Sequence, residues 1–94
     1  MRNVTFLGGG SFGTALGILL ANKGNKVSIY DRDKHVVDDI NLNRKNDRYI
    51  KNLHIPKNVT AYINLDEAIN DAKFIVLSVP SHVIRVVTRS LKGK

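Results

Sequence analysis

The chain has 94 residues and a mass of 10.5 kDa, which is room for one small domain and excludes a two-domain enzyme. Hydrophobic residues make up 43% and charged residues 24%, a balance typical of a folded globular domain and too apolar for a disordered tail. The sequence contains no cysteine, which excludes a disulfide scaffold and a thiolate zinc site and favours the reducing cytoplasm as its location.

The charge balance invites a hypothesis of polyanion binding. Fifteen Lys and Arg against eight Asp and Glu give a formal net charge of +7. The basic residues are spread along the chain without a recognition motif, so we interpret them as a solvated surface and keep a nucleic-acid-binding module as the rival. Glycines interrupt the apolar N-terminus, and no apolar stretch approaches the ~20 residues that a bilayer requires, so we expect neither a signal peptide nor a membrane partner.

The first half of the sequence alternates between strand and helix patterns. Residues 4–7 are apolar and rich in strand formers, and they stop at glycines, which predicts a buried strand. The apolar residues of 14–23 predict a helix that ends before Gly24. A second strand is predicted over 27–30 and a second helix over 33–45, before a long polar stretch.

The second half repeats this alternation. A strand is predicted over 59–63, then a helix over 65–72 that Asn64 caps. Residues 74–77 are apolar throughout, as in a strand covered on both faces, and a fourth helix is predicted over 83–91.

This alternation predicts an α/β fold, a truncated doubly wound (Rossmann) parallel sheet with strand order 3-2-1-4 and helices on both faces. In that order the strand at 74–77 would form an open, apolar edge of the sheet. Because such edges pair with other chains, we expect self-association through it.

The strongest functional motif is Gly8-Gly9-Gly10-Ser11-Phe12-Gly13, which matches G-x-G-x-x-G between a predicted strand and a predicted helix. Gly8 would permit the tight turn, Gly10 would let a pyrophosphate approach the backbone, and Gly13 would let helix and strand pack closely. The motif predicts a dinucleotide site. A glycine turn without a ligand, a flavin dinucleotide and a methyl-donor nucleoside remain the alternatives.

The end of the second strand bears on the choice of cofactor. Asp31 would accept hydrogen bonds from a ribose 2′-hydroxyl and favour NAD, whereas Arg32 would pair with a 2′-phosphate and favour NADP. Asp33 is interpreted as the N-cap of the following helix. The sequence therefore predicts NAD or NADP as the cofactor and leaves the choice open.

The three histidines do not make a site by themselves. His82 follows Pro80-Ser81 at a predicted strand end, where we weigh a first-turn helix residue against a pocket contact. No two histidines have metal-ligand spacing, so no metal ligand is predicted, and no nucleophile elbow with a Ser/His/Asp order occurs.

Four stretches together resemble the N-terminal part of bacterial NAD(P)-dependent glycerol-3-phosphate dehydrogenase. They are GGGSFGTAL at 8–16, IYDRD at 29–33, residues 64–72, and VPSHV at 79–83. The last of these also occurs in related 3-hydroxyacid and ketopantoate-type reductases, which remain an alternative. The resemblance covers essentially the whole chain and implies that residues 1–94 are the N-terminal part of a dinucleotide-binding domain.

The resemblance also implies function. The family reduces dihydroxyacetone phosphate, a triose phosphate, to sn-glycerol 3-phosphate, which feeds glycerophospholipid synthesis, and its helical catalytic domain and two active-site lysines would lie beyond Lys94. Ser11 and Phe12 would contact the dinucleotide, Arg32 would meet the adenosine ribose, and Tyr49 would close over the adenine side. After that tyrosine the family usually has Leu-Pro, and this chain has Ile50-Lys51.

Overall fold

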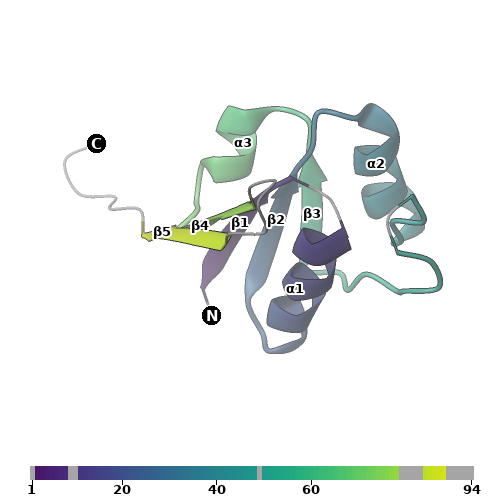
Figure 1. Cartoon of the computed structure of the whole chain (residues 1–94), viewed down its shortest axis with the longest axis horizontal. Helices are drawn as coiled ribbons and strands as arrows, with labels where there is room; N and C mark the ends of the chain where they lie inside the picture. The colour runs from purple at the N-terminus through teal and green to yellow at the C-terminus, as the bar shows by residue number, and fades with distance from the viewer. Residues whose placement is uncertain (1, 9–10, 49, 79–83, 89–94) are drawn as a thin grey trace.

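The computed structural model describes residues 2–8, 11–48, 50–78 and 84–88 (Figure 1). In chain order its elements are β1 (Asn3–Leu7), α1 (Ser11–Asn22), β2 (Lys26–Tyr30), α2 (Lys34–Asp38), the π-helical turn η1 (Asp39–Asn43), β3 (Val59–Tyr62), α3 (Leu65–Ile69), β4 (Phe74–Ser78) and β5 (Ile84–Thr88).

The sheet has the strand order β3-β2-β1-β4-β5, and its first four strands are parallel. The predicted order 3-2-1-4 is therefore confirmed. At the centre of the sheet Phe6 pairs with Ile29 on one side and with Val76 on the other. This register aligns the carboxyl ends of β1, β2 and β4 along one edge, where parallel α/β sheets bind ligands.

Helices cover both faces of the sheet, as predicted. On one face, α1 lies so close that a Cβ on Gly17 would stand 3.3 Å from Val27 and 3.6 Å from Phe6. On the opposite face, the buried Thr5 hydroxyl donates to the Ala68 carbonyl of α3 at 2.7 Å. Successive side chains of a strand point to opposite faces, so Thr5 faces α3 and Phe6 faces α1.

The apolar core lies mainly on the α1 face. Its largest fully buried apolar side chains are Phe6, Ile29, Ile40 and Ile55. The strand residues that face α3 include Thr5 and Ser28, which are more polar than their neighbours Phe6 and Ile29. Burial of apolar surface therefore fixes α1, α2 and η1 against the sheet, whereas α3 is joined partly by hydrogen bonds.

The predicted fourth helix is wrong over its described part. Ile84–Thr88 forms β5, which pairs antiparallel with β4, and Val76 faces Val86 across the pair. Four of these five residues, all except Arg85, are β-branched, and such residues favour strands over helices. The predicted open edge at 74–77 is wrong for the same reason, because β5 covers it.

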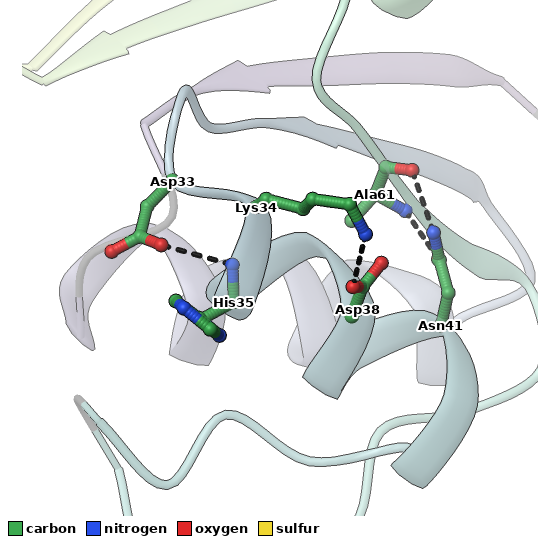
Figure 2. A network of polar contacts seen from close by, with 6 residues as sticks. All are labelled: Asp33, Lys34, His35, Asp38, Asn41 and Ala61. Atoms are coloured by element: carbon green, nitrogen blue, oxygen red, sulfur yellow. Dashed lines mark hydrogen bonds and ion pairs between the residues drawn. The ribbon is translucent and has the colours of Figure 1, made fainter.

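The predicted helix over 33–45 is divided. The five-residue helix α2 continues as the π-helical η1, and Arg44 ends it with a left-handed backbone of φ 55° and ψ 41°. The wider turn places Asn41 against β3, where its side chain bonds both backbone groups of Ala61 (Figure 2). A long-range contact therefore overrides the local helical pattern.

Three predicted helix ends are confirmed. Asp33 caps α2, since its Oδ1 accepts from the His35 N–H at 2.9 Å (Figure 2). Asn64 caps α3, since its Oδ1 accepts from the Glu67 N–H at 3.0 Å. Gly24 follows α1 with a φ of 95°, a conformation that favours glycine.

The polar stretch between η1 and β3 is held by side-chain hydrogen bonds. The Arg44 guanidinium donates to three backbone carbonyls, those of Ile55 at 3.3 Å, of Val59 at 2.6 Å and of Pro56. The buried Asn46 donates to the Thr14 hydroxyl of α1 at 2.9 Å. The stretch is therefore attached to both α1 and β3.

Candidate functional site

The candidate site lies at the carboxyl ends of β1 and β2. Gly8 directly follows β1, and its N–H donates to the Tyr30 carbonyl at the end of β2, at 2.8 Å. A cleft of about 450 Å³ opens there, and it is lined by Leu7, Gly8, Tyr30, Asp31, Arg32 and Leu65. Its volume lies within the roughly 300–1,000 Å³ that small-molecule sites occupy.

Two glycines of the motif, Gly8 and Gly13, lie within the described residues. Gly8 has a φ of 114°, which favours glycine, and a Cβ built on it would meet no atom of the described residues within 4 Å. Gly13 packs against the same turn, because a Cβ on it would lie 2.9 Å from the Gly8 carbonyl oxygen. The turn at Gly8 therefore has the backbone that the first glycine of a dinucleotide motif is expected to adopt, and Gly13 has the close approach expected of the last one.

Helix α1 begins immediately after this loop. It starts at Ser11 and runs for 12 residues, three residues earlier than the sequence pattern indicates. Ser11 and Phe12 form its first turn, whose N–H groups have no partner within the helix and suit an anion. The predicted contacts Gly10 and Tyr49 lie outside the described residues, as does His82.

At the end of β2, a short chain of hydrogen bonds fixes the backbone. The Asp31 N–H donates to the Tyr62 carbonyl of β3 at 3.1 Å, and Asp31 Oδ1 accepts from the Asp33 N–H at 2.8 Å. Asp33 in turn forms an ion pair with Arg48. Asp31 is thus held at the cleft by its own turn, while the Arg32 side chain beside it is exposed.

The structure brings together Gly8, Gly13, Asp31 and Arg32 among the predicted site residues. Sequence reasoning missed three apolar residues that line the same cleft, namely Leu7, Tyr30 and Leu65. The last residue of each strand marks two of them, since Leu7 ends β1 and Tyr30 ends β2. The position of Leu65 depends on how α3 crosses the sheet, which local spacing does not reveal.

A second cleft, of about 500 Å³, lies beside α2 and η1. Its lining includes His35, Asp38, Asp39 and Arg48, and it includes none of the predicted cofactor residues that the structure describes. Within the described ranges no group of three His, Cys, Asp or Glu residues could hold a metal ion. In the part of the chain that the structure describes, no helix is both long and apolar enough to cross a membrane.

Comparisons with known proteins agree on one family. The protein-family model described as "NAD-dependent glycerol-3-phosphate dehydrogenase N-terminus" matches residues 3–94. The glycerol-3-phosphate dehydrogenase [NAD(P)+] of Clostridium perfringens is 66% identical over all 94 residues, and that of Clostridium botulinum Alaska E43 is 64% identical. The chain spans 28% of the length of these relatives.

Solved structures are also similar. The crystal structure of glycerol-3-phosphate dehydrogenase from Coxiella burnetii aligns with a TM-score of 0.78 and 35% identity, over 85% of this chain and 25% of that one. The Plasmodium falciparum enzyme aligns with a TM-score of 0.73 and 28% identity, over 81% of this chain and 24% of that one. The chain belongs to the N-terminal domain family of NAD-dependent glycerol-3-phosphate dehydrogenase.

Proposed function

We propose that this chain is the dinucleotide-binding part of an oxidoreductase that interconverts dihydroxyacetone phosphate and sn-glycerol 3-phosphate with NAD(H) or NADP(H). The observation that carries the proposal is the Gly8 turn, which has a positive φ and lines one cleft together with Asp31 and Arg32. The relatives, which bear this activity in their names, support it. We place the enzyme in the cytoplasm, feeding glycerophospholipid synthesis.

In this proposal each of the predicted site residues has a task in binding the cofactor. Gly8 forms the tight turn, Gly10 lets the pyrophosphate approach the backbone, and Gly13 lets helix and strand pack closely. The first turn of α1, with Ser11 and Phe12, receives the negative charge of the pyrophosphate. Asp31 or Arg32 would meet the adenosine ribose, and Tyr49 would cover the adenine side. When the cofactor is bound, the reduced nicotinamide would supply the hydride in one direction and the oxidised nicotinamide would accept it in the other.

No residue of the chain is assigned a catalytic role. We expect the proton-transferring and substrate-binding lysines of the family beyond Lys94. The 94-residue chain alone should therefore bind dinucleotide weakly and should not reduce dihydroxyacetone phosphate. Turnover by the pure chain above that of the Gly10→Val variant would contradict this placement of the active-site lysines.

Titration calorimetry with NAD and NADP tests the binding proposal. Gly10→Val should abolish binding while circular dichroism stays unchanged, because a β-branched side chain would occupy the space of the pyrophosphate. Unchanged affinity in the folded variant would place the ligand elsewhere.

Salt separates the proposal from the polyanion-binding rival. Dinucleotide affinity should persist between 50 and 200 mM salt, whereas nucleic-acid binding through six to ten phosphates would fall by about three to five decades. If the affinity for NAD fell by that much, and if the chain bound a mixed-sequence DNA duplex tightly at low salt, the nucleic-acid-binding module would be favoured.

A further inference from the structure

We infer that Leu65 forms the apolar wall against which the adenine base of the cofactor packs, an inference that rests on the proposed function. Leu65 lies on α3, which follows β3, and the sequence motif does not include it. It nevertheless lines the same cleft as Gly8, Asp31 and Arg32. Its exposed side chain is the observation from which we start.

Leu65 is exposed although its helix packs on the sheet. It is the first residue of α3, and 43% of its surface is accessible. Ala68, three residues later and thus on the same side of the helix, is 3% exposed and lies against β1 through its carbonyl. The side of α3 that packs on the sheet at Ala68 therefore extends to the cleft, where it presents the large apolar side chain of Leu65.

The sheet supplies a floor under this side chain. Leu7 pairs with Tyr30, and Tyr30 pairs with Tyr62, so these three residues form one row across β1, β2 and β3. Two residues before the end of β1, Thr5 faces α3. Because side chains alternate along a strand, the whole row faces α3 as well. Leu7, Tyr30 and Leu65 thus make the apolar part of the cleft, beside the charged Asp31 and Arg32.

The order of groups in the cleft selects the base as the partner of Leu65. The pyrophosphate belongs at the glycine turn that follows β1, and the ribose belongs beside Asp31 at the end of β2. The next position along the sheet in that direction is the end of β3, and the chain reaches Leu65 three residues after Tyr62. An aromatic base bound there would cover apolar surface that is otherwise in water, which favours binding.

Leu65→Ala tests the inference, and Leu19→Ala is its control. Leu19 is 52% exposed on α1 and does not line the cleft. Calorimetry with NAD and ADP-ribose should show affinities about five- to tenfold lower for Leu65→Ala, because about 1 kcal/mol of apolar contact is lost. Leu65→Met, which keeps the apolar bulk, should stay within about twofold of the unchanged protein.

A second measurement locates the base directly. With leucine methyl groups labelled, nuclear Overhauser effects between Leu65 and adenine H2 or H8 should appear in the ADP-ribose complex. Binding of ADP-ribose with no such effect, or with equal affinities for Leu65→Ala and Leu19→Ala, would overturn the role of Leu65 and leave the proposed function intact. Failure of the unchanged protein to bind either NAD or ADP-ribose would overturn both.

Discussion

Asn41 pairs with Ala61 as a neighbouring strand would. Its Nδ2 donates to the Ala61 carbonyl at 2.9 Å, and its Oδ1 accepts from the Ala61 N–H at 2.8 Å (Figure 2). Ala61 lies in β3, the end strand of the sheet, and is 3% exposed. One side chain therefore satisfies both groups of a buried backbone residue at the sheet edge.

Replacing Asn41 with Ala should lower the free energy of unfolding by about 1–3 kcal/mol, because it leaves the two Ala61 groups without their partners. Urea denaturation followed by circular dichroism measures the change. Asn43→Ala is the control, since Asn43 is exposed and bonds only Asp39 among the contacts described for it. Equal effects of the two substitutions would show that the pairing with Ala61 adds no stability.

Gly13→Ala should destabilise the glycine turn. The added methyl group would stand 2.9 Å from the Gly8 carbonyl oxygen, which belongs to the backbone and can move only if the turn shifts. We expect a loss of about 1–3 kcal/mol in unfolding free energy and weaker dinucleotide binding.

Gly17→Ala is the comparison for this prediction, since its methyl group would meet a Val27 side-chain atom at 3.3 Å. It should change stability by less than about 1 kcal/mol, because the higher helix propensity of Ala offsets the tighter contact. A tolerated Gly13→Ala with unchanged NAD affinity would contradict the packing role of Gly13.

Arg44→Met should weaken the attachment of residues 55–59, which lead into β3. The substitution removes the cation that donates to the carbonyls of Ile55, Pro56 and Val59, and we expect a loss of about 2 kcal/mol in unfolding free energy. Hydrogen exchange should then become faster at the amide of Ile55, which donates to the Arg44 carbonyl. Lys45→Ala, which breaks only an exposed ion pair with Asp47, should be nearly neutral, and a similar effect of both would contradict this role.

The cofactor preference depends on Asp31 and Arg32, according to a further prediction. Arg32→Ala should weaken NADP binding by about ten- to a hundredfold and NAD binding much less, because only NADP carries the 2′-phosphate. Asp31→Asn should weaken NAD more, and it keeps a side-chain oxygen for the Asp33 N–H. Calorimetry with both cofactors measures the ratios, and equal losses for NAD and NADP in both variants would remove these side chains from ribose recognition.

Much of the sheet was predictable because its signals are local. The four parallel strands are short runs rich in β-branched and aromatic residues, and Asp33, Asn64 and Gly24 mark helix ends by their own conformational preferences. The π-helical turn was not predictable, because it depends on the contact between Asn41 and Ala61, 20 residues apart. In β5, hydrophobic spacing indicated a helix, whereas β-branching and pairing with β4 determined a strand.

The candidate site shows the same difference between features with local sequence signals and features that depend on long-range packing. The glycine spacing and the acid at the end of β2 predict Gly8, Gly13 and Asp31 as site residues, since these features follow directly from a strand, a turn and a helix. Leu65 gives no such signal, because an apolar residue in a short amphipathic helix is ordinarily interpreted as core. Only the packing of α3 over the sheet places it at the cleft.

The central place of β1 has a consequence for synthesis on the ribosome. β1 can pair with β2 once residue 30 has emerged, but its other edge awaits β4, whose Phe74 pairs with Val4. During the translation of more than forty residues the nascent sheet would present a hydrophobic strand with unpaired backbone groups, which is a hazard for aggregation. We expect nascent chains stalled before Phe74 to bind chaperones that recognise extended apolar segments, and those stalled well after Ser78 to escape them.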